Sequence, residues 1–131
     1  MAALDTNVVI RLIMGDDAKQ ARAAQQLLAA EPCKVSLSVL MESEWVLRSC
    51  YGLETGTINE SFRDFLQLEH VSGYEPLLTK LVIAAHAAGI DFADAVHVMQ
   101  IPDGEQFATF DRDMVRSAKR AGLACVALVR T

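Results

Sequence analysis

Four acidic side chains occupy positions from which they can project into one cleft. Asp5 follows the short apolar stretch "MAAL", and Asp111 follows "ATF", so both stand at the ends of predicted strands. Glu42 and Asp94 lie in the helical patterns "SVLMESEWVLRS" and "DFADAVHV". Two like charges about 4 Å apart repel by about 4 kcal/mol at an effective dielectric constant near 20, so such a group requires a positive partner.

No lysine or arginine in the same motifs is suited to that role, whereas a hard divalent cation with oxygen ligands is. Such an ion polarises a phosphoryl oxygen and lowers the pKa of a bound water, which can attack in line without a nucleophilic side chain. We therefore expect Mg²⁺ or Mn²⁺ at this site. The expected metal ligands and catalytic residues are Asp5, Glu42, Asp94 and Asp111.

Four polar residues beside these acids have two interpretations each. Thr6 and Asn7 can orient Asp5 or a ligand water from outside the metal's own ligands, or they can serve as turn and cap residues. Asp91 is placed to cap its helix and can also support the site. Asp113 is either an outer ligand or the N-cap of the last helix.

The elements that must position these acids alternate along the chain. Strands are predicted at 2–5, 33–38, 106–110 and 123–129, and helices at 7–14, 16–32, 38–51, 57–70, 75–89, 91–100 and 111–122. Short connections between such elements indicate parallel β-α-β units. We expect an α/β fold, a three-layer α/β/α sandwich with a short, mostly parallel central sheet. Ligands of such sheets bind beyond the carboxyl ends of the strands.

Several polar residues are predicted to begin these helices. The expected caps are Thr6 or Asn7, Asp16 with Asp17, Ser38, and a capping box formed by Thr57 and Glu60. Gly15 is expected to end the first helix.

The helix at 38–51 carries two acids on different faces. Glu42 shares a face with Val39 and Val46, which predicts that it points inward. Glu44 lies about 200° away by the helical period and has Arg48 four residues on, so a solvated ion pair is predicted there.

Composition places limits on the class of protein. The chain has 131 residues, of which 52% are apolar, and this fits one domain spanning 1–131. No stretch approaches the roughly 20 apolar residues that cross a bilayer, so a cytoplasmic protein is expected. The net charge of −5 argues against binding nucleic acid by overall electrostatics, although acids that share a metal ion are compatible with a nuclease.

Neither the cysteines nor the histidines suggest a separate site. Cys33, Cys50 and Cys125 are widely spaced, and we expect buried, reduced thiols. His97 is expected in the core or at its boundary, and His86 lies in an alanine-rich helical segment.

Four motifs together resemble the PIN-domain family, and within it the VapC-type toxins of bacterial toxin-antitoxin pairs. They are "LDTNVVIRL", "VSLSVLMESEWVLRSCYGL", "DFADAVHV" and "ATFDRDM", and their order covers nearly the whole chain. The resemblance implies a Mg²⁺- or Mn²⁺-dependent endoribonuclease whose acid quartet falls on Asp5, Glu42, Asp94 and Asp111. It also implies an RNA substrate, a homodimer and a cognate antitoxin that covers or disrupts the acidic site.

The last motif departs from the family pattern. Many members have asparagine where Asp111 stands and an acid slightly later that precedes phenylalanine, whereas here Asp113 precedes Met114. Asp111 and Asp113 are therefore both candidates for the fourth ligand.

Two other functions fit the same acids. One is a metal-dependent phosphatase of small substrates or a DNA nuclease. The other is a non-catalytic signalling module whose acid pocket accepts phosphate. That module needs a hydroxyl and a lysine near its acids; Thr109 supplies the first, and no lysine stands correspondingly.

Overall fold

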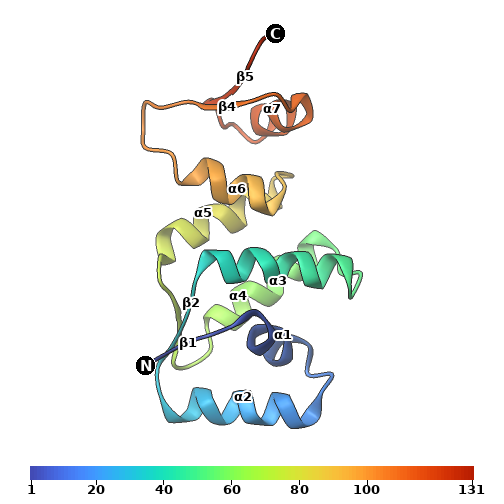
Figure 1. Ribbon diagram of the computed structural model, residues 1–131, viewed down its shortest axis with the longest axis vertical. Coiled ribbons are helices and arrows are strands. Elements are labelled where there is room, and N and C mark those ends of the chain that lie inside the picture. The colour runs from blue at the N-terminus through green and yellow to red at the C-terminus, as the bar shows by residue number, and fades with distance from the viewer. The chain divides into compact units, whose positions relative to one another are not determined.

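The computed structural model describes residues 1–131 as seven helices and five short strands. The chain divides into two compact units, unit 1 from Met1 to Pro76 and unit 2 from Leu77 to Thr131 (Figure 1). Every strand pair in either unit is parallel, so the expected α/β class with short parallel strands is confirmed. The assignment of 1–131 to a single domain stays a prediction.

Unit 1 holds a three-stranded parallel sheet in the order β1-β2-β3. Its elements are β1 (Ala2–Ala3), α1 (Thr6–Met14), α2 (Ala18–Ala30), β2 (Cys33–Val35), α3 (Leu37–Ser49), α4 (Thr55–Leu66) and β3 (Val71–Gly73). Ala3 is in register with Lys34, and the Leu4 amide donates to the Lys34 carbonyl at 2.8 Å. This hydrogen bond extends the pairing of β1 with β2 to Leu4, the residue before Asp5. Strand β3 was not predicted, because only the short stretch 71–74 remained between the helices expected at 57–70 and 75–89.

The core of unit 1 forms around α1, which packs against α2, α3 and α4 (Figure 1). Val9 and Ile10 of α1 are almost completely buried, and so is Phe62 of α4. Ile58, Phe62 and Phe65 recur at helical spacing on the buried face of α4, as predicted. The burial of α1 on three sides fixes the helix that begins at the end of β1.

The helix ends in unit 1 confirm some predicted signals. Gly15 ends α1 with φ of 63°, a left-handed conformation that glycine adopts without the steric cost of a side chain. Asp17 caps α2, because its carboxylate accepts a 3.0 Å hydrogen bond from the Gln20 amide.

Three predicted caps in unit 1 are wrong. Helix α1 begins at Thr6, so neither Thr6 nor Asn7 is its cap. Ser36, directly after β2, caps α3 by accepting from the Val39 amide at 3.2 Å, and Ser38 is already helical. The box of Thr57 and Glu60 fails because α4 begins two residues before Thr57, after Glu54. In each case the helix begins one to three residues earlier in the chain than the hydrophobic pattern alone indicates.

Unit 2 contains a parallel strand pair joined through a helix. Its elements are α5 (Pro76–Ala87, whose first residue belongs to unit 1), α6 (Phe92–Met99), β4 (Phe107–Thr109), α7 (Arg112–Arg120) and β5 (Val126–Leu128). Helix α7 packs on both β4 and β5. The His86 ring meets Phe92 edge-on at 5.2 Å, and the His97 ring stacks on Phe107 at 6.3 Å. These ring contacts join α5 to α6 and α6 to β4.

The cysteines only partly follow the prediction. All three thiols are free, as expected, but Cys50 is exposed, so the prediction of uniformly buried thiols is wrong for that residue. The longest helices have 13 residues, and none has the length and hydropathy needed to cross a bilayer.

Candidate active site

Asp5 stands at the carboxyl end of β1, where the chain turns into α1. Its carbonyl oxygen accepts the amides of Val8 at 3.1 Å and Val9 at 3.2 Å, which begins the helix. Its carboxylate is exposed and makes no hydrogen bond to the helix that it precedes. The backbone carbonyl of Asp5 therefore stabilises the start of α1, and both carboxylate oxygens remain available to a ligand.

The neighbours of Asp5 divide between the core and the surface. Thr6 is buried, whereas Asn7 is exposed and lines a groove of about 350 Å³ between α1 and α2. Val8, Ala24 and Leu27 supply apolar parts of the same groove. Of the two residues predicted to support Asp5, Asn7 is the one with a solvent-accessible side chain.

The burial of the two acids on α3 is the reverse of the prediction. Glu42 is exposed, and Trp45 on the same side is 55% exposed, so the predicted inward direction of Glu42 is wrong. Glu44 is buried at 3% exposure, so the solvated pair is also wrong in that respect. The predicted partner is confirmed: Nε of Arg48 donates to Glu44 at 2.9 Å.

The reversed face of α3 follows from its leucines. Leu37, Leu40 and Leu47 lie at helical spacing and are buried, and this stripe outweighs the valines that flank Glu42. Small Ser43 lies within the stripe, and its hydroxyl bonds the Val39 carbonyl at 2.7 Å. Glu42 consequently remains accessible, and it forms no ion pair with the protein.

Parallel pairing brings the starts of α1 and α3 to the same edge of the sheet in unit 1. Asp5 follows β1 and Ser36 follows β2, and these two strands are neighbours in register. Glu42 is the sixth residue of α3, about 9 Å along the helix axis from its cap. Both unit 1 acids therefore lie on elements that start at the carboxyl edge of the sheet.

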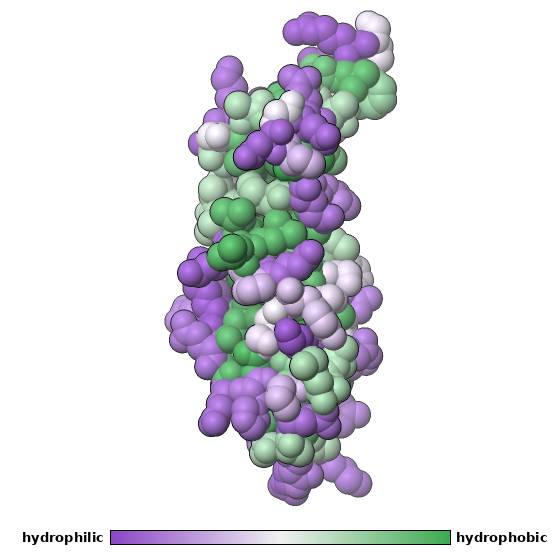
Figure 2. All heavy atoms as spheres, turned by 90° about the vertical axis from the view of Figure 1, so that its left-hand side faces the viewer, coloured by the Kyte–Doolittle hydropathy of each residue, from purple (hydrophilic) through white to green (hydrophobic).

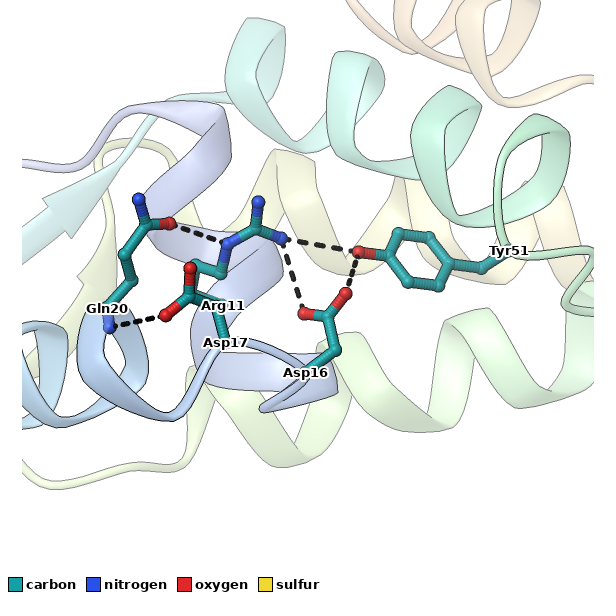
Figure 3. Close-up of polar contacts among 5 residues, drawn as sticks. All are labelled: Arg11, Asp16, Asp17, Gln20 and Tyr51. Carbon is teal, nitrogen blue, oxygen red and sulfur yellow. Dashed lines mark hydrogen bonds and ion pairs between the residues drawn. The ribbon is translucent and has the colours of Figure 1, made fainter.

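The side chain of Arg11 connects three other side chains by hydrogen bonds, and none of these contacts was predicted from the sequence (Figure 3). Arg11 of α1 donates through Nε to Gln20 at 2.7 Å and through Nη1 to Asp16 at 3.3 Å and the Tyr51 hydroxyl at 3.3 Å. The Tyr51 hydroxyl in turn donates to Asp16 at 2.6 Å. Asp16 is thus not the predicted cap; it joins α1 to the chain after α3.

The hydrogen bond from Tyr51 has a clear electrostatic effect. It stabilises the ionised carboxylate, so it lowers the pKa of Asp16, and Arg11 acts in the same direction. The same bond raises the pKa of Tyr51, because the donated proton is held by the carboxylate. No local sequence signal indicates this contact, since Tyr51 lies 35 residues from Asp16.

In unit 2, three carboxylates act on one another. Asp94, in the first turn of α6, is half-buried, and this burial raises its pKa. The charges of Asp91 and Asp111 raise that pKa further, and nearby His97 opposes them. The carboxylate of Asp94 accepts no hydrogen bond, and no lysine or arginine is among the groups that shift its pKa. His97 therefore offsets only part of the effect of burial and of the two neighbouring acids on Asp94.

Asp91 and Asp111 keep one oxygen each for a ligand. Oδ1 of Asp91 accepts the Asp94 amide at 3.1 Å, which confirms the predicted cap of α6. Oδ1 of Asp111 accepts the amides of Asp113 at 2.9 Å and Met114 at 3.1 Å, so Asp111 caps α7. The alternative in which Asp113 is the cap is wrong, and the Asp113 carboxylate pairs with Arg116.

No three His, Cys, Asp or Glu side chains of the chain lie close enough together to bind one metal ion. Unit 2 brings Asp91, Asp94 and Asp111 within electrostatic range of one another, and unit 1 offers Asp5 and Glu42 without partners. The donors are uniformly hard carboxylate oxygens, which suit a divalent cation.

Comparison with protein families gives one match, to the PIN domain, over residues 2–120. The chain belongs to the PIN domain family. PIN domains are generally metal-dependent nucleases that act on nucleic acid, and membership indicates this general activity here. Comparison with curated proteins and with solved structures gives no match.

For this PIN domain, Tyr51→Phe is expected to raise the pKa of Asp16 toward its ordinary value, because the donor of the 2.6 Å bond is lost. A lowered carboxyl pKa adds stability above the unfolded-state pKa and loses it as the pH falls through the folded-state pKa. The variant should therefore be less stable than the parent at neutral pH but not in strong acid. Carboxyl-carbon NMR titration and urea unfolding measure both effects. Tyr74→Phe is the control, and an unchanged Asp16 titration in Tyr51→Phe would contradict the assignment.

Asp94→Asn should stabilise the PIN domain in EDTA at neutral pH. Because the folded-state pKa of Asp94 is raised, its ionised form costs stability above that pKa and costs nothing below the unfolded-state value. The gain should vanish near about pH 3, below the ordinary aspartate pKa of about 3.9. Thermal unfolding at both pH values measures it, with exposed Asp103→Asn as the control. A variant less stable than the parent at pH 7 would contradict the electrostatic account.

Proposed function

We propose that this chain is a Mg²⁺- or Mn²⁺-dependent endoribonuclease whose catalytic carboxylates are Asp5, Glu42, Asp94 and Asp111. The observation that carries the proposal is the half-buried Asp94, whose ionised form is disfavoured by the charges of Asp91 and Asp111 and is favoured by His97 but by no lysine or arginine. Membership of a family of metal-dependent nucleases supports the choice of a divalent ion as the missing partner.

The residues fit such an ion by chemistry and by availability. Asp5 and Glu42 have carboxylates without protein partners, and Asp111 has a second oxygen beside the one that caps α7. Asp113 is engaged by Arg116, which favours Asp111 over Asp113 as the fourth ligand. Asn7 and Asp91 are the neighbours best placed to orient ligands from outside this set. Thr6 is buried, which leaves it a supporting role in positioning α1.

The reaction would be hydrolysis of a phosphodiester bond. The oxygen of a water bonds to phosphorus, the bond to the leaving oxygen breaks, and a proton passes to that oxygen. A bound Mg²⁺ or Mn²⁺ supplies Lewis-acid activation for this chemistry. The chain contributes carboxylates at helix starts, and the backbone at Asp5 and at Asp111 is held by the hydrogen bonds that begin α1 and α7.

Single-stranded RNA is the proposed substrate, on the resemblance of the motifs to VapC-type toxins. The rival substrates are DNA and small phosphomonoesters cleaved at the same acids. A phosphate-accepting signalling module is less well supported, because it would need a lysine beside its acids and no lysine stands correspondingly in the motifs.

We further infer that the chain is the toxin of a type II toxin-antitoxin pair. The same resemblance supports a homodimer, a cognate antitoxin that covers the acids, and action in the cytoplasm, where the RNA is. Exposed apolar side chains are available for such contacts on both units, among them Trp45, Leu77 and Leu81.

Purified protein is expected to cleave a single-stranded RNA oligonucleotide in Mg²⁺ or Mn²⁺ and to lose that activity in EDTA. Asp5→Asn and Asp94→Asn should each reduce the rate by more than about 100-fold, because even groups that only orient metal ligands account for about 10–100-fold. Gel analysis of labelled products measures the rate, and Asp103→Asn serves as the control. Full activity in both variants, or preferential hydrolysis of DNA or of a phosphomonoester, would overturn the proposal.

The toxin role is tested separately in growing bacteria. Induced expression of the wild-type chain should arrest growth, and Asp94→Asn, expressed to the same level, should not. The growth curve and the integrity of cellular RNA are the measurements. Normal growth with an active ribonuclease would contradict the toxin role while leaving the catalytic proposal intact.

A further inference from the structure

A cavity in unit 2 opens at the carboxyl ends of β4 and β5. Its volume is about 390 Å³, and its lining residues are Phe110, Arg112, Leu128, Val129, Arg130 and Thr131. The Val129 amide donates to the Thr109 carbonyl at 2.8 Å, so the chain after β5 is held against the end of β4. This volume is at the lower end of the range for small-molecule sites, about 300–1,000 Å³. The cavity is thus sized for a ligand such as one nucleotide.

An aromatic ring forms one wall of this cavity. Phe110 is 69% exposed, the most exposed aromatic side chain of the chain. Leu128 and Val129 extend the apolar surface beside it. Nucleobases stack on exposed aromatic rings of this kind, and stacking tolerates any base because every base has a flat face.

Two arginines complete the cavity, and neither has a protein partner. Arg112 and Arg130 are exposed and form no hydrogen bond or ion pair, whereas Arg116 pairs with Asp113 and Arg120 bonds Ser117. At the C-terminal end of the chain, hydrophilic side chains lie directly against hydrophobic ones (Figure 2). In a protein with a net charge of −5, unpaired guanidinium groups beside an exposed ring provide a local match to phosphate and base.

We propose that this cavity binds one nucleotide of a single-stranded RNA substrate, with the base stacked on Phe110 and the flanking phosphates bound by Arg112 and Arg130. The inference rests on the proposed function and adds to it the residues that hold the strand. An unpaired strand is required, because the bases of a duplex are stacked on each other and cannot reach the ring.

The position of Phe110 relates this subsite to the catalytic acids. Phe110 and Asp111 are consecutive, so their Cα atoms are about 3.8 Å apart. The Asp111 amide bonds the Thr109 hydroxyl at 3.0 Å, and the Asp111 carboxylate caps α7, which fixes the backbone on both sides of the ring. A base stacked on Phe110 would therefore lie against the residue that directly precedes a proposed catalytic residue, although Asp111 itself does not line the cavity.

The test measures binding of a fluorescein-labelled 12-nucleotide single-stranded RNA by fluorescence anisotropy, in EDTA so that no cleavage occurs. Phe110→Ala should raise Kd by about 5- to 150-fold, the range for loss of one base-aromatic stack, and Phe110→Trp should restore binding. Arg112→Ala combined with Arg130→Ala should weaken binding and reduce the slope of log K against log salt by about 1.4. Arg120→Ala, which removes an arginine outside the cavity, is the matched control and should leave Kd unchanged.

Each outcome bears on the subsite or on the catalytic proposal separately. Unchanged RNA affinity in Phe110→Ala, with the wild-type chain still cleaving RNA, overturns the subsite and leaves the nuclease function standing. A loss of self-association in Phe110→Ala during sedimentation, with RNA affinity unchanged, also overturns it and assigns the surface to a second copy of the chain. If the wild-type chain neither binds nor cleaves the RNA, both proposals fail.

Discussion

The charge on Asp94 is the constraint from which the function follows. Its carboxylate is half-buried within range of Asp91 and Asp111, and each of these conditions disfavours ionisation. A protein whose only requirement was to fold would gain stability from asparagine at this position. The chain carries an acid instead, and His97 is the one basic side chain that favours its charge, so the proposed bound ion would supply the remaining stabilisation. A hard cation meets that need and supplies the chemistry that the family performs.

Parallel β-α topology explains why the remaining acids need little local support. Each strand delivers the chain to the same edge of its sheet, and the residue after the strand is also the first cap position of the next helix. Asp5, Ser36 and Asp111 all occupy this junction. Ser36 and Asp111 use their side chains to cap a helix, whereas Asp5 caps through its backbone carbonyl alone. The junction thus serves folding after β1, β2 and β4 and leaves carboxylate oxygens available after β1 and β4.

Sequence reasoning succeeded where the determining interactions are local and failed where they are not. Gly15 and the cap at Asp91 were predictable, because a left-handed turn and an N-cap depend on residues within one helical turn. The buried side of α3 was not, since it is decided by which row of side chains packs better in three dimensions, and Glu44 is buried while its partner Arg48 remains exposed. The bond between Tyr51 and Asp16 joins segments 35 residues apart, and no spacing rule reports it. The assignment of Asp5, Glu42, Asp94 and Asp111 to one site, and their common ligand, remain predictions.

A net charge of −5 shapes how such an enzyme can hold RNA. Uniformly basic surfaces bind every phosphate and make affinity steeply dependent on salt. Here the unpaired cations beside Phe110 are few, so stacking must provide a larger share of the binding free energy than phosphate contacts do. Stacking requires unpaired bases, which selects single strands and loops over duplexes without reading a sequence. An acidic ribonuclease with one aromatic stacking surface beside Asp111 would therefore choose its target by RNA structure first, and any base preference would come from contacts farther along the strand.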